Sequence, residues 1–158
     1  MTSSDDAQVV RISATDTHAL RLAVLRADTP TKDVEFAEDD WPGAVHLGLR
    51  VGDELVGTSS WVPRRYEGPG AESEQHAHPA VQLRGMATAR HLQGRGLGGI
   101  LLEGGLAEMA AAGYELAWAR ARDAALDFYL RHGFEVRGDG FIDATTQLPH
   151  HLIVRSLR

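Results

Sequence analysis

Hydrophobic and polar residues alternate with a period of two over several short stretches of the chain, which is the pattern of half-buried β-strands. The clearest stretch is 45–51, and after Gly52-Asp53 a second run of the same kind covers 55–62. Two such runs joined by a tight turn predict an antiparallel hairpin. Further strands are predicted at 9–13, 81–88, 114–121, 134–137 and 151–157.

A second periodicity, near 3.6 residues, predicts helices between these strands. Apolar residues from Leu97 onward recur on one side of a helix that Gly113 ends, and a further helix runs from Asp123 towards Gly133. An earlier helix, for which Thr15, Asp16 and Thr17 are candidate caps, runs through Leu25. The order of strands and helices then predicts an α/β fold, with a mixed, partly parallel central sheet and helices on both faces.

Three segments carry no clear periodicity. Residues 1–8 are polar and acidic and are predicted to be a flexible leader. Residues 31–43 carry five acids and are interpreted as a surface loop or a frayed helix. Residues 63–79 are rich in Gly, Pro, Glu and His, and we expect a long loop too polar to pack.

Composition narrows the class of protein. Apolar residues make up 43% of the 158 residues and charged residues 24%, which fits one globular domain spanning 1–158. The net charge of -6 removes any general attraction to nucleic acid or anionic lipid. Because there is no cysteine, disulfide scaffolds, thiolate metal sites and cysteine nucleophiles are excluded. Without a signal peptide or a long apolar run, we expect a cytoplasmic protein with no membrane partner.

The stretch 93–99, which reads Gln-Gly-Arg-Gly-Leu-Gly-Gly, lies between a predicted strand and a predicted helix. Glycines let a main chain turn tightly and approach a ligand, and the first N–H groups of a helix attract anions. Arg95 adds a positive charge. The stretch therefore predicts a site for a pyrophosphate, and the alternative is a turn that only allows close packing of strand and helix.

The spacing of Gly94, Gly96 and Gly99 also fits the dinucleotide-binding pattern G-x-G-x-x-G. That pattern follows the first strand of a doubly wound sheet, whereas here some 80 residues precede it. The rest of a dinucleotide fold has no room in this chain, so a nicotinamide enzyme is a less favoured hypothesis than the two functions given at the end of this subsection.

Two motifs carry a resemblance to a known family. Gln93, Gly96 and Gly98 match the signature Gln or Arg, two residues, Gly, any residue, Gly or Ala. Residues 128–134, which read Phe-Tyr-Leu-Arg-His-Gly-Phe, look like the motif F-Y-x-x-x-G-F. Both belong to the GCN5-related N-acetyltransferases (GNAT), which the chain resembles from about Val45 onward.

The resemblance implies an acyl-CoA N-acyltransferase fold in which two splayed parallel strands grip the pantetheine of acetyl-CoA and 93–98 holds its pyrophosphate. The coenzyme-binding residues it implies are Met86, Ala87, Thr88, Gln93, Gly94, Arg95, Gly96, Leu97 and Gly98. Three positions depart from the pattern of many members. Arg90 stands in place of a proline after the strand, Arg120 in place of an asparagine after the next strand, and Ala124 in place of a serine at the start of the following helix.

Acetyl transfer from a thioester needs a deprotonated amine and a stabilised leaving thiolate, whose pKa is about 8.5. The resemblance places Tyr129 where an acid would act on the sulfur, and the alternative is a packed aromatic residue. No acid occurs at 82–85 to act as a base, so His150 is our candidate, weighed beside His151. Each histidine alone is more often a surface or core residue.

Other side chains have weaker signals. Arg84 is a candidate clamp for a carboxylate or phosphate of the acceptor, or simply an exposed strand residue. His76 and His78 are too few to make a convincing metal site, and we expect no metal. The acidic residues near Trp41 either form a solvated surface or attract a cationic amine; they are Glu35, Glu38, Asp39 and Asp40.

The function predicted from these observations is the transfer of an acetyl group from acetyl-CoA to an amine of a small molecule or peptide. The alternative is a non-catalytic module that senses CoA or acyl-CoA. The sequence does not identify the acceptor, and it leaves open whether the protein forms a homodimer.

Overall fold

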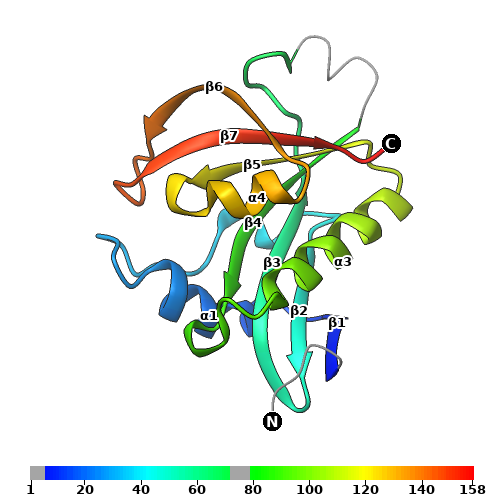
Figure 1. Ribbon diagram of the computed structural model, residues 1–158, viewed down its shortest axis with the longest axis vertical. Coiled ribbons are helices and arrows are strands. Elements are labelled where there is room, and N and C mark those ends of the chain that lie inside the picture. Colours follow the sequence, from blue (N-terminus) through cyan, green and yellow to red (C-terminus); the bar gives the residue numbers. More distant parts are fainter. Residues whose placement is uncertain (1–5, 72–78) are drawn as a thin grey trace.

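A computed structural model describes residues 6–71 and 79–158. In this part of the chain seven strands form one sheet in the order β1-β2-β3-β4-β5-β7-β6 (Figure 1). Only β4 and β5 pair in parallel, and the other neighbours are antiparallel, so the predicted mixed sheet is confirmed. The strands are β1 (Ala7–Arg11), β2 (Val45–Val51), β3 (Glu54–Pro63), β4 (Ala80–Thr88), β5 (Leu116–Arg122), β6 (Glu135–Ile142) and β7 (Pro149–Ser156).

Helical segments connect and cover the strands. The longest is α3 (Leu97–Ala111), which begins at the glycine-rich loop as its apolar periodicity predicts. The first helical segment is not a regular α-helix, because it passes from a 3₁₀ turn through one α turn into a π-helical turn. The remaining segments are η2 (Thr15–Thr17), α1 (His18–Leu20), η3 (Arg21–Leu25), η4 (Ala37–Asp40), η5 (Arg90–Leu92), η6 (Asp123–Ala125) and α4 (Leu126–Arg131).

Two neighbouring residues of β3 show that helices cover both faces of the sheet. The Trp61 ring packs against α3 at Gly105, where an added Cβ would lie 2.4 Å from the ring. Ser60 points to the opposite face, because successive side chains of a strand alternate, and it accepts a hydrogen bond from Arg21 of η3. The α3 side holds the main core, whose largest members include Trp61, Leu101 and Met109.

The parallel strands β4 and β5 separate soon after they begin. They pair only at Ala80–Gln82 of β4, and Figure 1 shows them running apart beyond this point. A bulge in β4 lies where they diverge, because Gly85 and Met86 together face a single residue of β3. Gly85 has a φ of +62°, which glycine adopts without the steric cost that a Cβ adds. The splayed strands thus open the sheet at its centre.

Two boundary predictions and one prediction about packing were wrong. Ala7 and Gln8, which were predicted to belong to a flexible leader, are part of β1 and pair with β2. The strand predicted at 134–137 continues to Ile142 through an irregularity in its pairing with β7. The segment after β3 is not too polar to pack, because Tyr66 is fully buried and meets the ring of Trp118 edge-on. None of the helices in the described ranges is long and apolar enough to cross a bilayer.

Candidate active site

A cavity of about 920 Å³ lies between β4, α3 and α4. It brings together seven of the nine residues that the resemblance implied for coenzyme binding: Met86, Ala87, Thr88, Gln93, Gly94, Gly96 and Gly98. The other two, Arg95 and Leu97, do not line it. The Arg95 side chain is exposed, and Leu97 is buried in the core, so Leu97 can face the cavity only through its main-chain N–H. We call this space the donor cavity.

The loop before α3 owes its shape to two glycines. Gly94 and Gly96 have φ values of +83° and +78°, a conformation that side chains with a Cβ rarely adopt. No heavy atom lies within 4 Å of a Cβ built on either residue, so the space beside them is open. The first N–H groups of α3 follow directly, without partners inside the helix. The loop therefore presents bare main chain and helix N–H groups, a combination that suits phosphate oxygens.

The edge of β4 that faces the gap also offers main-chain groups. Beyond Gln82 this edge has no strand partner within 6–71 and 79–158, because β5 has moved away. At the far end the Gln93 amide donates a hydrogen bond to the carbonyl of Thr88, which ties the loop to the strand. An extended chain can add to such an unpaired edge through main-chain hydrogen bonds.

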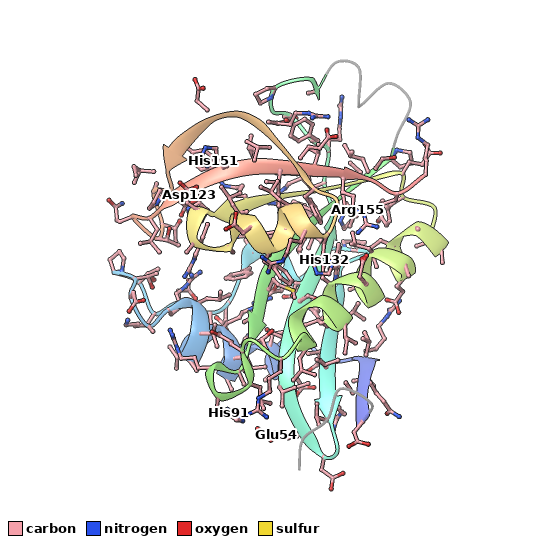
Figure 2. All side chains as sticks on the ribbon, viewed as in Figure 1. Glu54, His91, Asp123, His132, His151 and Arg155 are labelled. Atoms are coloured by element: carbon pink, nitrogen blue, oxygen red, sulfur yellow. The ribbon has the colours of Figure 1, made fainter. Side chains whose placement is uncertain are left out.

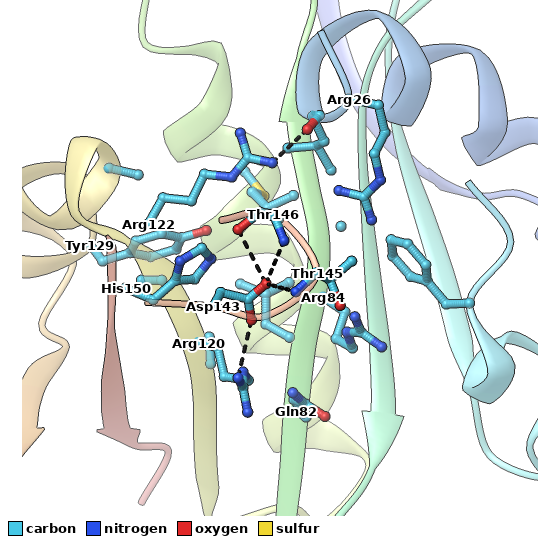
Figure 3. Close-up of a pocket in the computed structure, with 18 residues that line it drawn as sticks. Arg26, Gln82, Arg84, Arg120, Arg122, Tyr129, Asp143, Thr145, Thr146 and His150 are labelled. Carbon is cyan, nitrogen blue, oxygen red and sulfur yellow. Dashed lines mark hydrogen bonds and ion pairs between the residues drawn. The ribbon is translucent and has the colours of Figure 1, made fainter. Parts of the chain in front are cut away.

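A second, smaller cavity of about 190 Å³ lies on the other side of the gap (Figure 3). We call it the acceptor cavity. Five residues line both cavities, so the two spaces adjoin: Leu25, Met86, Arg122, Ala125 and Tyr129. A ligand in one cavity can therefore approach a ligand in the other beside these residues.

Tyr129 lies at this junction. Its ring is buried between the rings of Phe128 and Phe134, with centroids 5.2 and 5.5 Å away, and this packing fixes the ring orientation. The hydroxyl group has no hydrogen-bond partner among the residues that the structure describes, and Figure 3 shows it directed into the cavity. Burial raises the pKa of Tyr129 well above that of a free tyrosine, despite the nearby charge of Arg122. The phenol is therefore protonated at neutral pH.

The two adjacent histidines of β7 have different surroundings. His150 is 5% exposed and lines the acceptor cavity. Its Nδ1 is 2.9 Å from the carbonyl oxygen of Leu148; since a carbonyl only accepts, Nδ1 donates, and Nε2 keeps its lone pair in the neutral ring. His151 points the other way and meets the Asp123 carboxylate, 2.6 Å from Nδ1 (Figure 2). Only His150 is available to a ligand in the cavity.

The structure adds a carboxylate that the sequence analysis missed. Asp143 follows β6 and lines the acceptor cavity. Burial acts to raise its pKa, but hydrogen bonds from Thr146 and Arg120 outweigh burial and lower it. Asp143 is thus ionised at neutral pH and is a poor base. The Asp-Ala-Thr-Thr sequence predicts a turn, but no local signal places that turn beside Tyr129.

Four arginines line the same cavity, and only one of them, Arg84, was a candidate: Arg26, Arg84, Arg120 and Arg122. Arg84 forms an ion pair with Glu38, and its guanidinium lies 4.5 Å from the centre of the Phe36 ring. Burial and the neighbouring guanidinium groups of Arg21, Arg120 and Arg26 lower the pKa of Arg84 to about 10, so it remains charged at pH 7.

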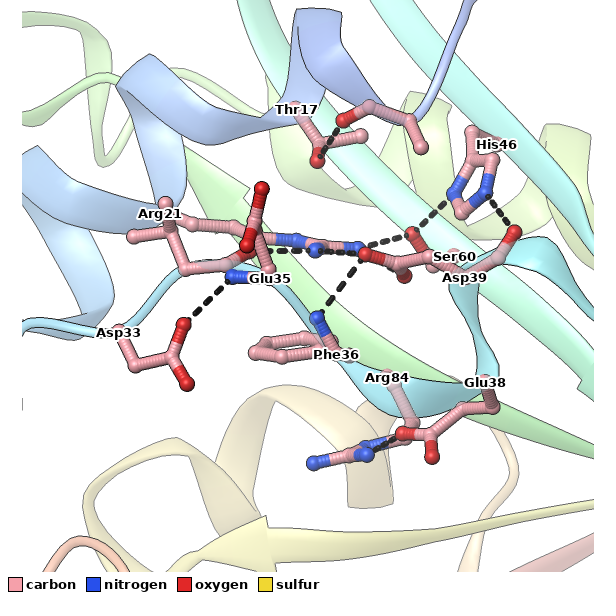
Figure 4. Close-up of polar contacts among 12 residues, drawn as sticks. Thr17, Arg21, Asp33, Glu35, Phe36, Glu38, Asp39, His46, Ser60 and Arg84 are labelled. Atoms are coloured by element: carbon pink, nitrogen blue, oxygen red, sulfur yellow. Dashed lines mark hydrogen bonds and ion pairs between the residues drawn. The ribbon is translucent and has the colours of Figure 1, made fainter.

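Two of the acidic residues of segment 31–43, Glu38 and Asp39, are paired with arginines and so are not free to bind a cationic amine. Asp39 holds the fully buried Arg21 through two hydrogen bonds of 2.8 and 3.0 Å, and Glu38 pairs with Arg84 (Figure 4). His46 joins this network through the Ser60 hydroxyl, 2.7 Å from Nδ1. Glu35 and Asp40 remain exposed. The network fixes η4 against β3 and β4, directly after Phe36, which lines the acceptor cavity.

Among the described residues no three His, Cys, Asp or Glu side chains are grouped closely enough to hold a metal ion. His76 and His78 lie outside the described ranges.

Known proteins resemble this chain in sequence and in fold. A profile described as Acetyltransferase (GNAT) family matches residues 14–134. The N-acetyltransferase YitI of Bacillus subtilis strain 168, itself uncharacterized, is 26% identical over 134 residues, which cover 85% of this chain and 86% of YitI. A Lactobacillus plantarum protein classed as an N-acetyltransferase has a similar fold, with a TM-score of 0.75, 19% identity and coverage of 96% of this chain and 99% of its own.

Escherichia coli ElaA has a TM-score of 0.73 to this chain at 17% identity, over 94% of this chain and 99% of ElaA. These likenesses support the predicted acyl-CoA N-acyltransferase fold, with its splayed parallel strands. Because the family profile spans most of the sequence and includes both motifs, this protein belongs to the GNAT family of acetyltransferases.

Proposed function

We propose that the protein transfers an acetyl group from acetyl-CoA to the amine of a small molecule or peptide. The observation that carries this proposal is the Tyr129 hydroxyl, unpaired among the described residues, where the donor and acceptor cavities adjoin. A group held in one cavity and an amine held in the other would meet beside this hydroxyl. Holding two reactants in this way lowers the entropic part of the barrier.

The donor cavity fits the coenzyme in three respects. The open space at Gly94 and Gly96 and the first N–H groups of α3 suit the pyrophosphate. The unpaired edge of β4 at Met86 and Thr88 suits the amide groups of the pantetheine arm. The coenzyme supplies the acetyl group as a thioester, which an unprotonated amine attacks with loss of the thiolate.

His150 is the proposed base. An amine is protonated at neutral pH and must lose its proton to become a nucleophile. Nε2 of His150 can accept that proton, directly or through a water molecule, because Nδ1 is held by the Leu148 carbonyl. The carbonyl fixes the tautomer and aims the other ring nitrogen into the cavity.

Tyr129 is the proposed group that stabilises the leaving thiolate. Because burial raises its pKa, the phenol is a much weaker acid than a thiol and would not give up its proton fully. It acts instead as a hydrogen-bond donor whose partner becomes charged as the thioester breaks. Such a bond strengthens in the transition state and so raises kcat.

The two adjacent histidines provide a matched test of the base. We expect His150→Asn to lower kcat about a hundredfold near pH 7, within the usual range for a general base, with recovery at high pH as free amine accumulates. His151→Asn removes an imidazole from the neighbouring residue of the same strand and serves as the control. Acetylation of a panel of amines is followed by release of CoA. Binding of acetyl-CoA without turnover of any amine would favour the sensor alternative over transfer.

A further inference from the structure

The acceptor cavity has more positive charge than its own carboxylates balance. Of its four arginines, Arg84 pairs with Glu38 and Arg120 pairs with Asp143 at 3.0 Å. Arg26 and Arg122 have no carboxylate within ion-pair distance in the described part of the chain. Two guanidinium groups are therefore left to a ligand or to solvent.

Main-chain carbonyls hold both of these guanidinium groups in place. Arg26 is only 6% exposed and donates from Nε to the Asp33 carbonyl, 2.8 Å away. Arg122 donates to the carbonyl of Leu25, so it is held against the end of η3 (Figure 3). A carbonyl orients a guanidinium but brings no negative charge to neutralise it. Each arginine is thus positioned by a carbonyl and has no ion-pair partner among the described residues.

The charges also repel one another. Burial lowers the pKa of Arg26, and Arg21 lowers it further, although Asp33 raises it. Burial and Arg26 lower the pKa of Arg122, although Asp28 and Asp143 raise it. A negative group inside the cavity would oppose these effects, because an opposite charge favours the charged form of each arginine. A cationic or neutral ligand would leave them unrelieved.

We propose that the acceptor is an amine that also carries an anionic oxygen group, a carboxylate or a phosphate, bound by Arg26 with Arg84 and Arg122 beside it. This inference rests on the proposed function and names the class of its acceptor. Asp143, which pairs with Arg120, is the carboxylate among the described residues of this cavity, and its negative charge suits the ammonium end of such a molecule. The cavity of about 190 Å³ fits a compact zwitterion, such as a free amino acid, better than the end of a folded chain.

The test compares paired acceptors of which one member carries the anionic group and the other does not. Common L-amino acids are assayed beside their C-terminal carboxamides, and phosphoethanolamine beside ethanolamine, with acetyl-CoA as donor. We expect at least one anionic member to exceed its neutral partner about tenfold to a hundredfold in kcat/KM, the effect of a charge-assisted hydrogen bond. The amino acid pair and the phosphate pair distinguish the two anionic groups.

Variants locate the effect. We expect Arg26→Gln to reduce the ratio of anionic to neutral kcat/KM at least tenfold, mainly through KM, and Arg26→Lys to restore part of it. Arg11 of β1 forms an exposed ion pair with Glu108 of α3, so Arg11→Gln removes one positive charge outside the cavity and is the matched control for net charge. Melting curves report whether Arg26→Gln folds; if it does not, Arg84→Gln gives the same test at a side chain that is 33% exposed.

The outcomes separate this inference from the proposed function. Neutral amines acetylated as well as their anionic partners would overturn the inference and leave acetyl transfer intact. Binding of an anionic amine that Arg26→Gln weakens, seen by calorimetry in the presence of CoA but without turnover, would overturn the transfer and support the inference. If neither turnover nor binding favours the anionic member of any pair, the inference about the acceptor is overturned.

Discussion

Replacing Tyr129 with phenylalanine removes one hydroxyl group and leaves the ring. The ring is 7% exposed and held by Phe128 and Phe134, so its packing is retained. The hydroxyl has no partner among the described residues, so its removal leaves no protein group unpaired. We therefore expect the free energy of unfolding to change by less than about 0.5 kcal/mol.

The effect of the same substitution on catalysis is expected to be much larger. A hydrogen bond to a charged group contributes about 1.5 to 3 kcal/mol. If Tyr129 makes this bond only as the thiolate leaves, its loss lowers kcat by about tenfold to 150-fold, at 1.36 kcal/mol per factor of ten. The affinity for acetyl-CoA should be unchanged, because the bond is absent from the bound ground state.

Three measurements decide between a catalytic and a structural tyrosine: kcat in an acetylation assay, the affinity for CoA by titration, and the melting temperature. Tyr114→Phe makes the same chemical change at a partly buried tyrosine outside both cavities and is the control. An undiminished kcat in Tyr129→Phe would refute the reasoning. A joint loss of melting temperature, affinity and turnover would make Tyr129 a structural residue.

Three further predictions concern the loop, the buried ion pair and the pH profile. Gly96→Val should abolish the rise in melting temperature that acetyl-CoA produces, whereas Gly113→Val, also at positive φ with open space around it, should retain it. A surviving shift in Gly96→Val would contradict the proposed phosphate loop. Asp39→Asn should lower the free energy of unfolding at pH 7 by about 3 to 5 kcal/mol, because it leaves the buried Arg21 unpaired. Burial opposes the shift, but hydrogen bonds from Arg21 and Phe36 lower the pKa of Asp39, so its contribution is present above about pH 4 and is lost as pH falls through the lowered pKa. Denaturant titrations should thus show the gap between wild type and Asp39→Asn narrowing as the pH falls below about 4, and a constant gap would be evidence against this linkage. Because burial raises the pKa of Tyr129, kcat should show no alkaline decline due to a tyrosine below about pH 10, and a decline there that Tyr129→Phe lacks would contradict the assignment.

Local sequence patterns predicted the parts of the fold that depend on neighbouring residues. The hairpin of β2 and β3, the helix α3 and the parallel unit around it follow from periodicity and turn residues, and the structure confirms them. The end of β6 does not follow from such patterns. Gly138 and Gly140 resemble a turn, but pairing with β7 carries the strand on to Ile142. Strand length there depends on a partner strand, which local propensity does not report.

The candidate site likewise has one part that local sequence patterns predict and one part that they do not. The donor loop is one continuous stretch with its own signature, so the sequence reveals it. The acceptor cavity is built from side chains of separate segments, among them Arg26, Arg122 and Asp143. Their positions become significant only when the chain has folded. The acids of 31–43 were misleading for the same reason, because the partner of Asp39 is Arg21 in another segment.

The separation of β4 and β5 has a consequence for how the protein opens and closes. In the described part of the chain, the antiparallel strands β1 to β4 and the strands β5 to β7 are two half-sheets that share three residue pairs. Such a seam is where a cooperative structure divides most easily into independently exchanging units. A ligand lying along the seam bonds to one half-sheet and packs against the other, and so joins them. Amide hydrogens of both halves, including those far from the ligand, should then exchange together and more slowly when the seam is filled.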